Sequence, residues 1–140
     1  MSSHVLCNRV YNFGSDYALP SRVIDVGPAD GSQPARLAIP EEHGEEADVC
    51  PYVALSHRWG SPQIVPRTVR RTLNRHLEIL DWDSLTPTFQ DAIHITRRLH
   101  IRYLWIDSLC IVQDDYEDFE RECTRMHFTY MRAFCTIAAR

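Results

Sequence analysis

The chain has 140 residues, of which 44% are hydrophobic and 24% are charged, and its formal net charge is −4. A chain of this length and composition buries a hydrophobic core without needing disulfides or metals, so we expect a soluble globular protein. The acidic balance provides no basic field for nucleic acid or for anionic lipid, which argues against both as partners.

The cysteines are odd in number and widely spaced: Cys7, Cys50, Cys110, Cys123 and Cys135. The sequence has no Cys-x-x-Cys pair and no nearby histidine ladder, so we predict no metal site and expect reduced, mostly buried thiols. No apolar run approaches the roughly 18 residues of a membrane span, and the N-terminus lacks a signal pattern. These features predict a cytoplasmic protein without a membrane span.

The first third of the chain, residues 1–51, is expected to form an N-terminal extension. Short apolar stretches at residues 21–26 and 35–39 flank a turn-rich connection at residues 27–32, a pattern typical of a β-hairpin. Residues 41–48 are strongly acidic and predict an exposed linker.

The next elements begin the main sheet. Residues 52–56 form a compact apolar run between turn signals, which predicts an interior strand. Residues 68–80 carry apolar side chains at helical spacing and predict a helix. Thr86 as a cap and Pro87 in the first turn predict a second helix that runs to about His100.

The last elements are a strand over residues 103–112, a helix over residues 116–134 and a short strand over residues 135–139. The helix has an apolar stripe that we expect to face the core: Phe119, Cys123, Met126, Tyr130 and Phe134. Strands that alternate with helices through short connections predict parallel pairing with right-handed crossovers. The fold class is therefore α/β, with a mostly parallel sheet flanked by helices in three layers and an N-terminal β-hairpin extension.

Polar groups at the carboxyl ends of buried strands mark the place where open α/β sheets bind ligands. The first strand of the main sheet ends in Ser56-His57-Arg58-Trp59-Gly60. Arg58 can hold a phosphate through charge-assisted hydrogen bonds, and Trp59 can stack on an aromatic ring. The alternative is that Trp59 fills the core and Arg58 pairs with a local acid. No standard phosphate-binding loop and no serine-nucleophile elbow occurs in the sequence.

Two carboxylates are further candidates. Asp107 lies within the strand predicted over residues 103–112 and is either a ligand-facing carboxylate or an acceptor for loop amides. Glu122 lies one helical turn after Phe119, on the flank of the apolar stripe. Glu122 is either the charged group of a site or a simple ion-pair partner of Arg121 or Arg125.

Several long motifs, taken together and in order, closely resemble the HET (heterokaryon incompatibility) domain of filamentous fungi. They are residues 52–60, 88–93, 102–115 and 118–122, followed by Met126, Tyr130 and residues 136–139. The lead-in at residues 19–26 also looks like the segment that precedes such domains. The resemblance implies a HET domain over residues 52–140, and we expect that domain to continue beyond residue 140.

The resemblance implies a role in fungal allorecognition, a form of innate immunity in which fusion of incompatible strains triggers programmed cell death. HET domains also look like remote relatives of TIR (Toll/interleukin-1 receptor) domains, which implies a TIR- or flavodoxin-like three-layer fold. In that comparison residues 53–60 resemble the first TIR strand. Residues 118–122 resemble the region that supplies the catalytic glutamate of NAD-cleaving members.

The TIR comparison implies that the chain is a hydrolase that cleaves NAD⁺ at the nicotinamide–ribose bond, with NAD⁺ as substrate and no cofactor required. Cleavage creates positive charge on the ribosyl ring, and Glu122 is the carboxylate expected to stabilise that charge. We expect Glu122 to face a hollow shared with Arg58 and Asp107. The residues expected to bind NAD⁺ are Ser56, His57, Arg58, Trp59, Gly60, Trp105, Asp107 and Phe119. The alternative is a non-enzymatic scaffold that self-associates and recruits other cell-death proteins, in which Glu122 is structural.

Overall fold

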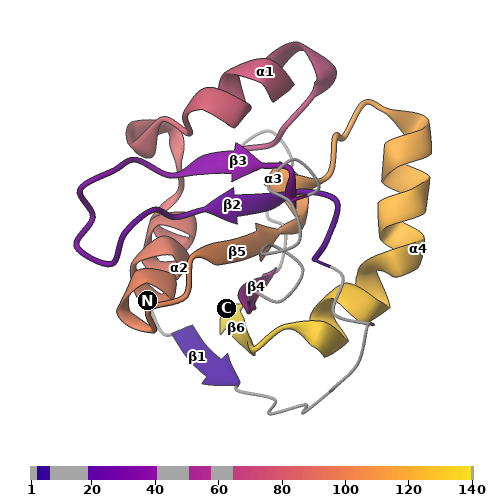
Figure 1. The fold of residues 1–140 in the computed structure, drawn as a ribbon. Helices are drawn as coiled ribbons and strands as arrows, with labels where there is room; N and C mark the ends of the chain where they lie inside the picture. The colour runs from indigo at the N-terminus through magenta and orange to yellow at the C-terminus, as the bar shows by residue number, and fades with distance from the viewer. Residues whose placement is uncertain (1–2, 7–18, 41–50, 58–64, 140) are drawn as a thin grey trace.

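The computed structural model of the chain describes residues 3–6, 19–40, 51–57 and 65–139. These residues form an α/β fold built on one six-stranded mixed sheet, with the strand order β1-β6-β4-β5-β2-β3 (Figure 1). The strands are β1 (Ser3–Leu6), β2 (Val23–Asp25), β3 (Arg36–Ala38), β4 (Tyr52–His57), β5 (Tyr103–Ile106) and β6 (Cys135–Ala139).

The helices of the described residues lie between and after the central strands. They are α1 (Arg70–Glu78), the 3₁₀ turn η3 (Trp82–Ser84), α2 (Pro87–Arg98), the single turn α3 (Asp107–Cys110) and α4 (Tyr116–Arg132). Helix α1 lies beyond β3 at one edge of the sheet, and β1 forms the opposite edge (Figure 1). None of these helices is long and apolar enough to span a membrane.

The centre of the sheet consists of three parallel strands, with β4 between β5 and β6. The chain passes from β4 to β5 on one side and then returns to β6 on the other side. The strand order therefore reverses at β4. In open α/β sheets, ligands bind outside the carboxyl ends of the strands at such a reversal. The carboxyl ends here are His57, Ile106 and Ala139.

The predicted β-hairpin of the extension is confirmed. Strands β2 and β3 pair antiparallel, with Ile24 opposite Leu37, and the connection between them places Gly27 and Gly31 at positive φ. Strand β2 also pairs antiparallel with β5, where Ile24 lies opposite Leu104. The hairpin thus extends the main sheet.

The prediction of a mostly parallel sheet is wrong. Among the strands that the structure describes, the two pairings of β4 are parallel, whereas β1–β6, β2–β5 and β2–β3 are antiparallel. The parallel prediction considered only the strands joined through helices. Strands that precede the βαβ units have no such constraint and close the sheet from both sides with antiparallel pairs. The three-layer, TIR-like arrangement stays a prediction.

The predicted strand over residues 103–112 ends early. Strand β5 stops at Ile106, and the chain then forms the helical turn α3. The side chains of Leu109, Cys110 and Ile111 remain buried after this change of direction. Because an apolar run that is buried on all sides lacks a diagnostic period, the sequence does not distinguish a continuing strand from a buried turn.

Helix α2 follows its prediction closely. The hydroxyl of Thr86 accepts a hydrogen bond from the amide of Phe89 at 3.3 Å, and Pro87 occupies the first turn. The helix buries Phe89, Ala92, Ile93 and Thr96, which lie on one face. It packs on β5 and contributes to the main hydrophobic core.

Helix α4 contradicts its predicted orientation. Of its expected apolar stripe, Phe119 and Cys123 are exposed, and Met126 and Tyr130 are only partly buried. Phe134, just past the helix, is also exposed. The fully buried side chains of α4 are Asp118, Glu122 and Thr129. The face of α4 turned to the rest of the protein is therefore mixed, because Met126 and Tyr130 pack against the core beside the buried polar residues.

Candidate functional site

The first group of predicted site residues lies at the carboxyl end of β4. Ser56 is exposed at this end, and His57 is the last residue of the strand. Arg58, Trp59 and Gly60 lie outside the described residues. The structure therefore places two of these residues at the reversal of strand order, the position that the strand-end argument indicated.

Asp107 and Phe119 come together at the carboxyl end of β5. They line a hollow of about 300 Å³ together with Ile111, Gln113, Cys123 and Met126. The side-chain amide of Gln113 donates to the carbonyl of Asp107 at 3.1 Å and to that of Ile111 at 2.8 Å, which holds the α3 turn in place. We call this space the Asp107 hollow.

Asp107 itself has a structural role as well as access to this hollow. Its Oδ1 accepts a hydrogen bond from the amide of Ser108 at 2.7 Å, so the expected contact with a loop amide is present. The residue is only partly buried. A carboxylate that stabilises a turn and borders a hollow can do both tasks, because it has two oxygens with several acceptor positions.

Trp105 occupies the core. Its side chain is 1% exposed and meets the ring of Tyr130 edge-on, with ring centroids 5.5 Å apart. Such edge-to-face pairs stabilise a packed interior. The ring of Trp105 is therefore engaged within the protein, and stacking on a ligand requires a rearrangement of this packing.

Glu122 is buried, with 3% of its surface exposed. Among the described residues no hydrogen-bond donor reaches its Oε1 atom, and its nearest charge partner is the Nε of Arg121 at 3.6 Å. The expected pairing with Arg121 thus exists as an ion pair without a hydrogen bond. Because a buried polar atom without a partner costs free energy, this oxygen requires a physical explanation.

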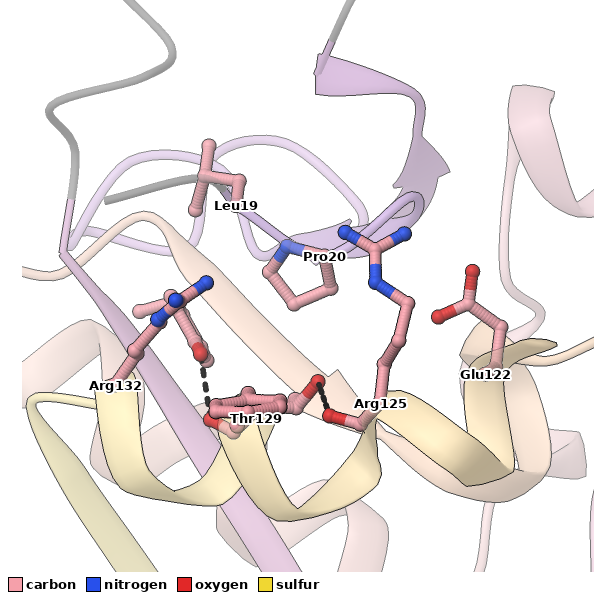
Figure 2. A pocket seen from close by; sticks show the side chains of 8 residues that line it. Leu19, Pro20, Glu122, Arg125, Thr129 and Arg132 are labelled. Atoms are coloured by element: carbon pink, nitrogen blue, oxygen red, sulfur yellow. Dashed lines mark hydrogen bonds between the residues drawn. The ribbon is translucent and has the colours of Figure 1, made fainter. Parts of the chain in front are cut away.

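A second, smaller hollow borders Glu122. Its volume is about 40 Å³, and its lining is Leu19, Pro20, Tyr52, Glu122, Arg125, Phe128, Thr129 and Arg132. Figure 2 shows Leu19 and Pro20 over the row of α4 side chains that includes Glu122 and Arg125. We call this space the Glu122 hollow.

The expectation that Glu122 and Asp107 share one hollow is wrong. Asp107 borders the larger hollow, and Glu122 borders the smaller one on a neighbouring face of α4. The rotation of α4 that buries Glu122 is the reason, because it turns Phe119 and Cys123 towards Asp107 instead. Arg58, the third expected member, lies outside the described residues.

The carboxylates of Asp107 and Glu122 nevertheless both influence the pKa values of the Cys110 and Cys123 thiols. Burial, with smaller contributions from the negative charges of Asp107 and Glu122, raises the pKa of the Cys110 thiol to about 12. Burial also raises the pKa of Cys123, again with contributions from Asp107 and Glu122. Both thiols are therefore protonated and unreactive near neutral pH.

The cysteine prediction holds only in part. Cys110 is a buried free thiol, as expected, but Cys123 is exposed. Cys135 is disulfide-bonded, which contradicts the prediction of reduced thiols at that position. Cys7 and Cys50 lie outside the described residues. Among the described residues, no three His, Cys, Asp or Glu side chains gather in a group that can hold a metal ion.

Asp118 is the polar residue that sequence reasoning missed. It is 4% exposed and forms ion pairs with Arg22 and with Arg121, the latter at 2.6 Å. Its Oδ2 also accepts the amide of Val112 at 2.9 Å. The only signal in the sequence is its position four residues before Glu122, which places both carboxylates on one face of the helix.

Arg22 completes this cluster from the other end of the chain. Besides pairing with Asp118, its Nε donates a hydrogen bond to the carbonyl of Cys110 at 2.9 Å. The side chain of Arg22 is 12% exposed. One arginine thus joins the segment before β2 to α3 and α4, and Asp118 is fully satisfied by charge-assisted bonds.

Comparison with known protein families gives a match for this part of the chain. The family model described as heterokaryon incompatibility protein (HET) matches residues 52–140, which include β4, both hollow-lining helices α3 and α4, and Glu122. Comparisons with curated proteins and with solved structures found no match. The family match covers more than half of the sequence and includes the predicted motifs. The chain belongs to the heterokaryon incompatibility (HET) family.

Proposed function

We propose that this HET-family chain is a cytoplasmic cell-death effector of fungal non-self recognition that cleaves NAD⁺ between nicotinamide and ribose. Glu122 is the catalytic carboxylate in this proposal. The family match supports the heterokaryon-incompatibility role. The resemblance of HET domains to TIR domains and the state of Glu122 support the reaction.

The observation that carries the proposal is the buried Glu122 oxygen without a hydrogen-bond partner among the described residues. Asp118, one turn earlier on the same helix face, has ion-pair partners on both of its oxygens. A carboxylate retained in a buried position for structure alone is expected to be paired as Asp118 is. A buried carboxylate with an unused oxygen is typical of groups that meet a charge arriving with a substrate.

The chemistry follows from where charge develops. As the bond between C1′ of the ribose and the nicotinamide nitrogen breaks, its electron pair stays on the nitrogen and the ribosyl ring becomes positive. A carboxylate beside C1′ stabilises that charge more strongly in a water-poor site than in bulk water. Water then adds to C1′ and releases one proton, which gives nicotinamide, ADP-ribose and H⁺.

The Asp107 hollow supplies a place for the nicotinamide ring. Its volume of about 300 Å³ is at the lower end of the range of small-molecule sites. The ring of Phe119 can stack on nicotinamide, and the carboxylate of Asp107 attracts the cationic ring of NAD⁺. Glu122 follows Phe119 by one helical turn but borders the neighbouring Glu122 hollow, so the ribose reaches its carboxylate only if that hollow opens towards the Asp107 hollow.

The decisive experiment measures nicotinamide release from NAD⁺ by the purified chain, including at high local concentration. We expect Glu122→Gln to lower the rate by about 100-fold or more, as for loss of a group that stabilises transition-state charge. Glu120→Gln is the matched control, because Glu120 is an exposed glutamate on the same helix. If a folded wild-type chain releases no nicotinamide at any concentration, the enzymatic proposal fails.

A second candidate function is self-association without catalysis. It is favoured by the exposed large hydrophobic side chains on and next to α4, which are Tyr116, Phe119, Phe128, Met131 and Phe134. Exposed apolar groups gathered along one element mark an interaction surface. Loss of cell toxicity in Phe128→Ser, together with full toxicity of Glu122→Gln, is the result that favours this candidate over the enzyme.

A further inference from the structure

Residues 19–22, just before β2, lie over the catalytic candidate. Leu19 is 8% exposed, Pro20 is buried, and both line the Glu122 hollow. Figure 2 shows these two side chains above α4, on the side to which the row containing Glu122 projects. Glu122 therefore borders a hollow that is closed on another side by Leu19 and Pro20, two residues outside the range that the HET family model matches.

A single arginine fixes this segment to the site. Arg22 pairs with Asp118, one turn before Glu122, and its Nε donates to the carbonyl of Cys110 at 2.9 Å. Both bonds end on residues that border the candidate site in sequence and space. The position of residues 19–22 thus depends on the contacts of Arg22 together with the burial of Leu19 in the core.

The covered state leaves no room for a substrate at Glu122. A hollow of about 40 Å³ has space for water, since one water molecule needs roughly 10–15 Å³. It does not accommodate a ribose or a nicotinamide ring. Glu122 with 3% of its surface exposed is consequently closed to the reaction assigned to it.

We propose that residues 19–22 form an autoinhibitory cover over Glu122, which opens when Arg22 releases Asp118. The inference rests on the proposed function for its effect on NAD⁺ cleavage, but the movement itself is independent of any activity. We call residues 19–22 the cover segment.

The opening is local because the sheet anchors the chain directly after the cover segment. Strand β2 begins at Val23, and Ile24 pairs with both Leu37 of β3 and Leu104 of β5. The cover segment can therefore swing about the junction at residues 22–23 while β2 stays in place. Openings of this kind are cooperative local events that cost less than global unfolding.

The test measures how readily a reagent in solution reaches the Glu122 carboxylate. Carbodiimide and glycine ethyl ester convert exposed carboxylates to amides, and peptide mass spectrometry assigns the label to each residue. Glu120 is the internal control, because it is exposed on the same helix. In the wild-type chain we expect Glu122 to react at least about tenfold more slowly than Glu120, since its surface is closed.

Arg22→Gln is the variant that releases the cover. Loss of a hydrogen bond to a charged group destabilises the closed position of the cover segment. The fraction of open molecules then rises, and the rate of Glu122 labelling is expected to rise with it, roughly tenfold or more. Arg36→Gln is the matched control, because Arg36 also pairs with a buried aspartate, Asp25 at 3.6 Å, on the hairpin. Arg36→Gln is expected to leave Glu122 labelling unchanged.

Leu19→Ala provides a second route if Arg22→Gln fails to fold. It thins the cover while it keeps the ion pair, and it is expected to raise Glu122 labelling in the same direction. The proposal is overturned if Glu122 reacts as fast as Glu120 in the wild-type chain. It is also overturned if folded Arg22→Gln, or folded Leu19→Ala where Arg22→Gln does not fold, leaves Glu122 labelling unchanged.

The same variants separate the cover from the enzyme. If labelling rises and nicotinamide release rises with it, both proposals hold. If labelling rises while no variant releases nicotinamide, the cover is confirmed and NAD⁺ cleavage is rejected. Nicotinamide release that depends on Glu122, but is insensitive to both Arg22→Gln and Leu19→Ala in folded chains, confirms the enzyme and rejects the cover.

Discussion

Helices α2 and α4 both contact the sheet, but they bury opposite kinds of side chain. Helix α2 buries an apolar face led by Phe89. Helix α4 buries Asp118, Glu122 and Thr129, while Phe119 and Phe128 are exposed. An amphipathic helix ordinarily turns its apolar stripe to the core, because burial of that stripe stabilises the fold. The orientation of α4 indicates that stability is not the only property that its buried face serves.

Substitution of one phenylalanine on each helix tests this contrast most strongly. We expect Phe89→Ala to lower the free energy of unfolding by about 4 kcal/mol, because it removes a fully buried ring and leaves a cavity. Phe119→Ala is expected to lower it by only about 1 kcal/mol, since this side chain is 42% exposed and borders a hollow. Urea denaturation of both variants measures the difference. Similar losses in the two variants would mean that α4 stabilises the fold through Phe119 after all.

The two buried carboxylates of α4 provide the next contrast. We expect Asp118→Asn to cost about 3 kcal/mol of unfolding free energy, because it breaks a buried pair and leaves Arg22 without its partner. Glu122→Gln is expected to cost less than about 1 kcal/mol, since one carboxylate oxygen has no hydrogen bond to lose. Denaturation of both variants in the same buffer provides the comparison. A larger loss for Glu122→Gln would assign Glu122 to structure.

Stability at alkaline pH tests the environment of the buried Cys110 thiol. The pKa of Cys110 is raised by burial from 9.0 to about 12. The thiol therefore ionises in the unfolded chain first, and its contribution to stability is complete below pH 9 and is lost as pH rises towards 12. Between pH 9 and 10 we expect this group to remove up to about 1.4 kcal/mol per pH unit.

Cys110→Ala is the control for this alkaline effect. The variant lacks the titrating thiol, so its unfolding free energy should fall less steeply between pH 9 and 10 than that of the wild-type chain. Tyr52 and Tyr130, whose pKa values are also raised by burial, contribute at higher pH in both chains. Equal slopes in the two chains would show that the environment of Cys110 does not hold its proton.

The smallest expected effect is a difference in acid sensitivity between the N-terminal caps of α2 and α4. The Thr86 hydroxyl caps α2 and does not titrate, whereas the Asp115 carboxylate caps α4 by accepting the amide of Asp118 at 3.2 Å. This hydrogen bond lowers the pKa of Asp115 below 3.8. The stabilisation by the cap is present above pH 3.8 and is lost as pH falls through the lowered pKa.

Amide hydrogen exchange resolves this acid effect residue by residue. Below pH 3.8 the amide of Asp118 should lose protection before the amide of Phe89 does. Asp115→Asn keeps a capping oxygen without the titration, so protection at Asp118 should then depend less on pH. Parallel loss at both helices would mean that acid weakens the whole fold rather than the start of α4.

The sequence predicts well those features that local physical chemistry determines. The cap at Thr86 and Pro87 predicts the start of α2, and the turn residues around Gly27 and Gly31 predict the hairpin. Their pairing partners are close in sequence, so competing interactions are few. The end of β4 is predicted for the same reason, because the apolar run that forms it is short and bounded by turn signals.

Long-range contacts account for the features that the sequence does not predict. The burial of Asp118 depends on Arg22, which is 96 residues away in sequence. Asp118 and Glu122 lie on the same face of α4, so the pair with Arg22 is compatible only with an orientation that also buries Glu122, which no periodicity within the helix indicates. The antiparallel strands at both edges likewise depend on pairings with distant strands, such as β1 with β6.

The most direct test of the central claim is a crystal structure of the chain with bound NAD⁺ or a non-hydrolysable analogue. We predict that the nicotinamide ring lies in the Asp107 hollow, against Phe119, with C1′ of the ribose next to the carboxylate of Glu122 and the cover segment displaced. A dinucleotide that binds elsewhere, while Glu122 stays enclosed beneath Leu19 and Pro20, would contradict the account.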